Sequence, residues 1–374
     1  MQQSSDVVIA GGGVIGLSLA YELALRKVKV SVLERGQIGR ESSWAGAGIL
    51  APQAEMERGG ELAQLMLASR KLYPEFVREL SSRAGVPIDF KTCGLIQVAL
   101  TEQEEQALQH RQAFQVELGL SFEHLSASEA FRLEDAFSPD IRCALYFPNE
   151  AYVDNRQFVE ALRIACVNLG VQLVCGCQVH SVRSQSGSAA GFETNLGFWS
   201  AKRVIIAAGS WSGQVATPLR GTWPVKPARG QIVAVKCPAP VVKHIIYSGD
   251  CYLVPRSDGR ILIGSTVEWV GYDTRVTLEG IQRITSAALA VAPVLKDATF
   301  LTAWSGLRPF SEDGLPILGV TQEPGLYVAT GHFRNGLLLS PITAKLMAEL
   351  VVTGEAAELL QAFSPLRFSD AASP

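Results

Sequence analysis

Three glycines near the N-terminus are the residues whose types and spacing most directly indicate chemistry. Gly11, Gly13 and Gly16 form a G-x-G-x-x-G motif, and Glu34 follows 18 residues after Gly16. In such a motif the first glycine permits a tight turn, the second admits a pyrophosphate to the backbone, and the third lets a helix pack on a strand. The helix N-terminus offers N–H groups to the phosphates, and the acid can accept hydrogen bonds from a ribose. The motif predicts a dinucleotide site, for NAD or FAD alike.

The residues around the motif predict the elements that would position it. Asp6–Ala10 and Lys29–Leu33 are short apolar runs typical of buried parallel strands. Between them, residues 17–24 repeat apolar types at helical spacing. A glycine-rich turn that binds nothing is the alternative, but the order of strand, motif, helix, second strand and acid favours a ligand.

Two segments far downstream repeat the strand pattern. Arg203–Gly209 reads as a buried strand, and Gly325–Gly331 as a strand that enters a loop at 332–336. Leu337–Leu350 is predicted to be helical after Pro341, and its N-terminus would stabilise negative charge on a reduced flavin ring. The chain has no second G-x-G-x-x-G, which an enzyme passing electrons from NAD(P)H to a flavin would be expected to show. These features favour FAD.

Composition narrows the class of protein. Hydrophobic residues make up 48% of the 374, and a net charge of −3 gives no electrostatic reason to expect a nucleic-acid partner. The five histidines lack metal-ligand spacing, so no metal is expected. Seven cysteines without a regular framework indicate reduced thiols in the cytoplasm, and the triplet Cys175-Gly-Cys177 is predicted to lie in a strand. The sequence contains no uninterrupted run of about 18 apolar residues, so no membrane-spanning segment is expected.

Two segments differ in pattern from the nucleotide-type strands around them. Residues 86–145 and 224–300 contain alternating strand patterns such as Gly259–Gly264, and we assign them to a substrate-binding domain. The expected fold is α/β, with a Rossmann-type FAD-binding domain and a discontinuous α+β substrate domain built on an antiparallel sheet. The FAD-binding domain would comprise residues 1–85, 146–223 and 301–374.

Several longer runs resemble one known family nearly from end to end. The runs are Glu34-Arg35, Ser42–Pro52, Cys251–Arg256, Ala303–Pro309 and Gly331–Pro341. Together they resemble the D-amino-acid oxidase superfamily of flavoproteins, and within it the glycine oxidases of thiamine biosynthesis. The S-S-W-A-G-A-G-I-L-A-P and G-H-F-R-N-G runs are far more specific than the first glycine motif.

The resemblance implies a noncovalent FAD and hydride transfer from the substrate Cα to flavin N5, with O2 as the final acceptor. The implied substrates are glycine, sarcosine and small D-amino acids. The implied products are an imine that hydrolyses to the 2-oxo acid and ammonia, and hydrogen peroxide. Within thiamine biosynthesis the imine would be passed on for thiazole formation. Related bacterial enzymes form homotetramers, which predicts a homo-oligomer.

The resemblance also assigns roles to residues. Arg308 matches the arginine that pairs with the substrate carboxylate, which a guanidinium fork can hold bidentately. Tyr252 matches a tyrosine that supports the same carboxylate, and Arg334 matches a second active-site arginine. The structural alternatives are ion pairs for the arginines and core packing for the tyrosine. The expected substrate pocket comprises Ile49, Tyr247, Asp250 and Val267.

On the cofactor side, Val179 matches an adenine contact, Ser42 and Ser43 match pyrophosphate contacts, and Gly46 and Gly48 would let the backbone approach the flavin ring. The other expected cofactor residues are Val14, Ile15, Arg35, Ala47, Ala208, Gly209, Trp211, His332, Arg334, Asn335, Gly336 and Leu337.

Several alternatives stay open at this point. Covalently bound flavin is disfavoured, because no cysteine follows Cys251 and Ala45 stands where a histidine would attach the ring. A quinone-linked D-amino-acid dehydrogenase remains open, since these motifs do not reveal O2 reactivity. A flavoprotein without turnover and a nicotinamide dehydrogenase are the alternatives from other classes. No general base stands out in the sequence.

Overall fold

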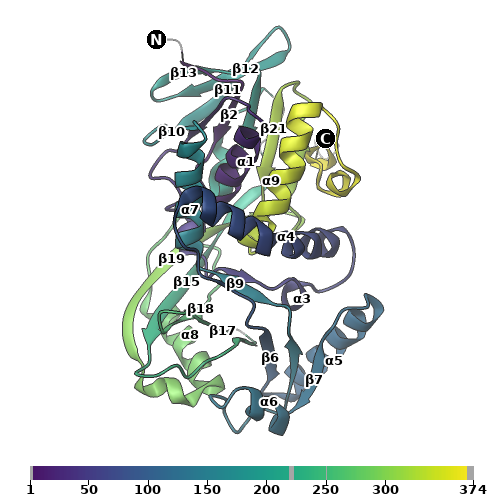
Figure 1. The fold of residues 1–374 in the computed structure, drawn as a ribbon, viewed down its shortest axis with the longest axis vertical. Coiled ribbons are helices and arrows are strands. Elements are labelled where there is room, and N and C mark those ends of the chain that lie inside the picture. Colours follow the sequence, from purple (N-terminus) through teal and green to yellow (C-terminus); the bar gives the residue numbers. More distant parts are fainter. Residues whose placement is uncertain (1–2, 219–222, 250, 369–374) are drawn as a thin grey trace.

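The computed structural model describes residues 3–218, 223–249 and 251–368, so Asp250 lies outside the described residues. A largely parallel sheet in the order β10-β3-β2-β14-β21-β20 occupies the upper half of Figure 1, with β20 antiparallel to β21. Its strands are Gln172–Val174 (β10), Val30–Leu33 (β3), Val7–Ala10 (β2), Arg203–Ile206 (β14), Leu326–Thr330 (β21) and Ile317–Val320 (β20). The four strands predicted from apolar runs are adjacent here, and their burial explains why those runs are uninterrupted.

Helices cover this sheet. They are Val14–Leu25 (α1), Glu61–Ala84 (α4), Asn155–Asn168 (α7) and Gly336–Thr353 (α9). Helix α1 packs on both α7 and α9, so it is apolar on most of its surface. Its N-terminus is set by the glycine turn: Gly11 has φ 113°, and a Cβ on Gly16 would overlap the Gly11 carbonyl oxygen. The first and third motif glycines therefore have the tight-turn and close-packing roles predicted for them.

Helix α9 covers the predicted range 337–350 and begins at Gly336. Pro341 lies inside the helix, whereas the prediction had placed it ahead of the helix. A proline within a helix leaves the carbonyl four residues earlier without its usual N–H donor. Here the Leu337 carbonyl accepts hydrogen bonds from the hydroxyls of Tyr73 and Ser340 instead. Hydroxyl groups therefore replace the missing backbone donor.

The length and apolar composition of α9 would also suit a membrane-spanning helix. However, 61% of its residues are buried inside the fold, where it packs against α1 and α4. Such burial is typical of the core helix of a soluble protein.

A second, larger sheet occupies the lower half of Figure 1, in the order β19-β15-β18-β17-β16-β6-β8-β7. Its strands are antiparallel except for the β16–β6 pair. They are Thr299–Ser311 (β19), Val225–Lys236 (β15), Arg260–Gly264 (β18), Cys251–Pro255 (β17), Ile245–Ser248 (β16), Leu95–Ala99 (β6), Cys143–Phe147 (β8) and Glu123–Ser126 (β7). Because β19 lies in this sheet, residues 301–311 go with the larger sheet rather than with the FAD-binding segment. The division into two domains stays a proposal.

Three helices flank the larger sheet: Glu102–Glu117 (α5), Ala127–Leu133 (α6) and Leu278–Val291 (α8). Thr101 with Glu104 and Ser126 with Glu129 form capping boxes at the starts of α5 and α6. Among the described residues there are also short 3-10 helices: Gly209–Gln214, Pro293–Asp297, Glu358–Phe363 and Pro365–Phe368.

Small elements connect the two sheets. The helices Ser42–Ala45 (α2) and Pro52–Glu55 (α3) flank β4, which belongs to a small sheet of Ile49–Leu50 (β4), Ala151–Val153 (β9) and Phe90–Lys91 (β5). Another sheet contains Gln3–Ser4 (β1), Gly197–Ser200 (β13), Ser188–Thr194 (β12) and Val179–Gln185 (β11).

The C-G-C triplet does not lie in a strand, so that prediction is wrong. Cys175 and Gly176 form a turn between β10 and β11, and Gly176 has φ 67°. Cys175 is exposed whereas Cys177 is buried, and the described residues contain no disulfide. The alternation of the two cysteines therefore reflects a turn in which Cys175 is exposed and Cys177 is buried.

Candidate active site

One continuous cavity runs from the glycine turn of the parallel sheet to the inner face of the larger sheet. Its walls come from segments far apart in the chain: residues 10–15, 33–55, 177–180, 207–215, 230–232, 306–309 and 329–337, together with Tyr247, Tyr252 and Ser265. Nearly all the predicted cofactor residues line this cavity. Gly16 does not, because its role is the close contact with Gly11 beneath the cavity wall.

At one end Glu34 joins the glycine turn to the end of β3. Its two carboxylate oxygens accept the Gly12 N–H at 2.8 Å and the Gly36 N–H at 2.9 Å. The side chain is buried but still lines the cavity. A carboxylate has about four acceptor positions, so Glu34 retains capacity for two ribose hydroxyls.

The N-terminus of α1 faces the cavity beside two serines. Gly13 is its N-cap residue and makes no side-chain cap, and the Val14 N–H donates to Ser43 Oγ at 2.9 Å. The Ser42 hydroxyl donates to the Leu307 carbonyl, which ties α2 to β19. The N–H groups of a helix start, with glycine instead of a side chain over them, fit a pyrophosphate. The residues present therefore suit the dinucleotide expected from the motif.

Beyond Glu34 the cavity ends among polar and aromatic side chains. The Arg35 guanidinium lies 3.5 Å from the Trp211 ring centre and 2.6 Å from a Glu41 carboxylate oxygen. Val179 lines the same cavity together with Cys177 and residues 178 and 180. This end offers flat apolar surface and backbone groups, which suit an adenine.

At the middle of the cavity two backbone segments converge. Gly46, Ala47 and Gly48 approach from α2, and residues 335–337 approach from the start of α9. Asn335 makes no side-chain cap, and the first helical bond runs from the Leu339 N–H to the Asn335 carbonyl. The N–H groups of residues 336–338 thus precede the first hydrogen bond of the helix and confer partial positive charge there.

Arg308 on β19 marks the other end of the cavity. Its guanidinium donates to the Thr266 carbonyl at 3.0 Å and to the Ser265 hydroxyl at 2.5 Å. Both acceptors are neutral, so they orient the side chain without cancelling its charge. Burial lowers the pKa of Arg308, which nevertheless stays a cation at neutral pH. An oriented cation on a cavity wall can bind a carboxylate.

Two tyrosines from neighbouring strands complete this end. The rings of Tyr247 and Tyr252 stack with centroids 6.1 Å apart. Burial raises the pKa of both hydroxyls, and the positive charge of Arg334 opposes that rise. The structure therefore brings Arg308, Arg334 and Tyr252 together, as the sequence analysis expects.

Glu55 is the residue of this end that the sequence analysis missed. It lines the cavity from α3, and one of its carboxylate oxygens accepts a hydrogen bond from the Tyr247 hydroxyl at 2.7 Å. A carboxylate opposite two arginines gives the site an acceptor for an amino group. No local pattern distinguishes Glu55 from other acids, because its position depends on how α3 is held.

Of the expected pocket residues, Ile49 and Tyr247 line the cavity and Val267 does not. Val267 is half-buried on the segment after Thr266, beyond the contact with Arg308. Ser265 and Phe333 line the wall without having been predicted.

The chain is similar to known proteins along almost its whole length. Residues 6–350 match the family described as FAD dependent oxidoreductase, DAO. Glycine oxidase of Geobacillus kaustophilus (strain HTA426) is 36% identical over 370 residues, which is 98% of each protein. The bifunctional protein ThiO/ThiG of Trichormus variabilis is 36% identical over 380 residues, covering 98% of this chain and 56% of that protein. The crystal structure of glycine oxidase from Geobacillus kaustophilus superposes with a TM-score of 0.93 at 36% identity, over 97% of this chain and 98% of that one.

A pH-dependence follows from His332, which lines the cavity and is 3% exposed. Burial lowers its pKa from 6.5 to about 3, so protonation favours the unfolded chain, and stability is lost as pH falls below 6.5. Between pH 7 and 5 this group should cost about 2 kcal/mol of unfolding free energy. The H332Q variant should not show this decrease in unfolding free energy between pH 7 and 5. Urea unfolding of both proteins at the two pH values, with any bound dinucleotide removed, measures it, and parallel pH profiles would contradict the assignment.

Proposed function

The chain belongs to the family of FAD-dependent oxidoreductases, and from this premise we propose that it is an oxidase of glycine, with O2 as the electron acceptor. The observation that carries the proposal is Arg308, a cation held by neutral partners at one end of a cavity whose other end fits a dinucleotide. FAD supplies the group that accepts a hydride from the substrate Cα. The products are the imine, which hydrolyses to glyoxylate and ammonia, and hydrogen peroxide.

The residues of the chain bind and orient the substrate. Arg308 pairs with its carboxylate, and the fixed plane of the guanidinium limits how the Cα–H bonds can point. Tyr252 and Arg334 add a hydroxyl and a second cation to the same carboxylate. Glu55, held by Tyr247, is the acceptor for the amino group and for the proton that an ammonium must lose before hydride transfer.

The shape of this end favours small substrates. Tyr247, Tyr252 and Ile49 line it, so little space remains beside the Cα. One methylene is worth only about 1–3 kcal/mol of discrimination in such a pocket. We therefore propose sarcosine and small D-amino acids as further substrates. No observation favours a quinone-linked D-amino-acid dehydrogenase, and the similarity to glycine oxidases supports the oxidase.

The pathway role extends this proposal. A relative named as a bifunctional protein carries a region like this chain within a longer chain. We propose that the imine made here is likewise used for thiazole formation in thiamine biosynthesis. We propose a cytoplasmic location, because the seven cysteines form no disulfide within the described residues.

We also propose a homo-oligomer, a tetramer by the family resemblance. Several large apolar side chains are exposed on α8, on the segment before it and on β19: Trp269, Leu278, Phe300 and Leu301. Burying them against another copy would stabilise an assembly. Light scattering of the purified protein should give a multiple of 40.2 kDa. A monomer at micromolar concentration would contradict this proposal.

The purified protein should be yellow, and anaerobic glycine should bleach its flavin absorbance. Admitting air should restore the absorbance with release of hydrogen peroxide. A flavin that bleaches with D-alanine but not with glycine would remove the substrate assignment and keep the enzyme class. Bleaching by glycine without O2 consumption in air would instead favour the quinone-linked enzyme.

Replacing Arg308 should impair substrate binding and leave FAD in place. Losing one partner of a buried charge pair costs about 2–5 kcal/mol, so R308M should lower kcat/KM for glycine by roughly 30- to 4,000-fold. R308K keeps the positive charge but loses the bidentate guanidinium, so its kcat/KM should lie between those of R308M and the wild type. R275M is the matched control, because Arg275 is 84% exposed and pairs with Asp273 at the surface. R308M with kcat/KM within threefold of wild type would exclude the role of Arg308.

A further inference from the structure

Arg256 is a buried arginine that the proposed mechanism does not use. It follows β17, and the residue is 6% exposed. Its Nη2 group donates to the Ala47 carbonyl at 2.6 Å, a contact between residues 209 apart in the chain. Its Nη1 group is buried and has no hydrogen-bond partner among the described residues. This buried guanidinium therefore donates a short hydrogen bond to a neutral carbonyl group and not to a carboxylate.

That carbonyl belongs to the segment that forms the middle of the cavity. Ala47 and Gly48 both line the cavity, and Gly48 has φ 70°. A Cβ on Gly48 would overlap the Val153 carbonyl oxygen and lie 3.2 Å from Arg256 Nη2. The Val153 N–H also donates to the Gly48 carbonyl at 2.8 Å. Arg256 and β9 thus hold this segment from the side away from the cavity.

The bond fixes the direction of one peptide group. In a trans peptide the C=O and N–H point in opposite directions. Because the Ala47 C=O points at Arg256, the Gly48 N–H points away from it. A cation on the carbonyl also polarises the peptide and makes that N–H a stronger donor.

The charge of Arg256 is only weakly compensated. Its guanidinium lies 4.8 Å from the Tyr152 ring centre. The nearby carboxylates have other partners: Asp154 caps α7 and pairs with Arg260 at 3.4 Å, and Asp89 binds Ser257 at 2.8 Å. Burying a charge without a close counter-ion costs several kcal/mol, so this arrangement is expensive for stability alone.

We propose that Arg256 is a positioning residue that acts through the Ala47–Gly48 peptide, holding it so that the cavity side favours negative charge on the reduced cofactor. This inference rests on FAD as the cofactor and is independent of glycine as the substrate. Gly46–Gly48 is the segment expected to approach the flavin ring, so a fixed and polarised donor there shifts the equilibrium of flavin reduction.

The test measures that equilibrium in the FAD-loaded protein without substrate. Anaerobic titration against a reference dye should show that R256M lowers the equilibrium constant for two-electron reduction about tenfold, which for this couple corresponds to about 30 mV. Sulfite, an anion that adds to oxidised flavins, should bind R256M at least several-fold more weakly. R256Q keeps a donor for Ala47 without the charge and should fall between R256M and R256K.

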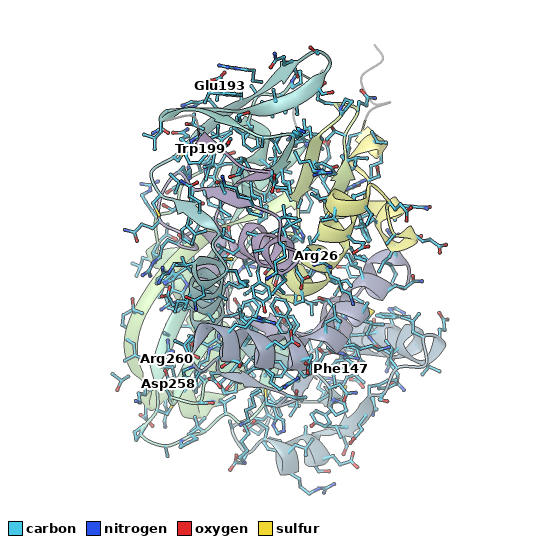
Figure 2. The ribbon with its side chains drawn as sticks, turned by 45° about the horizontal axis from the view of Figure 1, so that its top comes forward. Arg26, Phe147, Glu193, Trp199, Asp258 and Arg260 are labelled. Atoms are coloured by element: carbon cyan, nitrogen blue, oxygen red, sulfur yellow. The ribbon has the colours of Figure 1, made fainter. Side chains whose placement is uncertain are left out.

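The matched control is R260M. Arg260 is close in sequence, and it lies beside Asp258 at the edge of the molecule, bound to it at 2.6 Å (Figure 2). It makes no bond to Ala47, so R260M should reduce like the wild type. An equilibrium constant for reduction of R256M within twofold of the wild-type constant would overturn the proposal. If R256M fails to retain FAD, the comparison is made between R256Q and R256K. Equal equilibrium constants for reduction would overturn the proposal, and a lower constant for R256Q would support it.

Discussion

The contact between Gly16 and the Gly11 carbonyl determines where α1 can begin, and the geometry of the cavity follows from it. With a side chain at either position the helix would stand away from β2, and its first N–H groups would no longer face the ligand. Glu34 then ties the end of β3 to the same turn through the Gly12 N–H. The close contact between Gly16 and Gly11 and the Glu34 side chain thereby hold two strands and a helix together.

The opposite end of the cavity has a different origin. Arg308 and Tyr252 come from strands of the larger sheet, whereas Glu55 and Arg334 come from short segments next to the parallel sheet. The site exists only where the two sheets meet, and α2, α3 and the start of α9 occupy that junction. Ser42 bonded to the Leu307 carbonyl, and Trp304 bonded to the Ala45 carbonyl at 2.9 Å, connect α2 directly to the strand that carries Arg308.

Sequence reasoning succeeded where one local pattern has one structural meaning. Uninterrupted apolar runs predicted β2, β3, β14 and β21, because strands buried on both faces admit little else. It failed where distant groups decide: Pro341 is tolerated inside α9 because Tyr73, from another helix, donates to Leu337. Glu55 was missed for the same reason. The position of α3 depends on buried Gln53, whose N–H donates to the Glu150 carboxylate at 2.9 Å.

The cavity wall near the glycine turn was easier to predict than the wall near Arg308. Backbone groups form much of the first, and glycine spacing reveals their positions, as at Gly13. The second depends on side chains whose direction is a tertiary property. Val267, which follows Thr266, accordingly does not line the cavity.

The cavity brings together segments far apart in the chain: residues 11–48 contribute one part of its wall, and residues 329–337 contribute another. A newly made N-terminal unit can therefore form only part of the site. During synthesis, complete enclosure of a ligand has to await the segment 329–337.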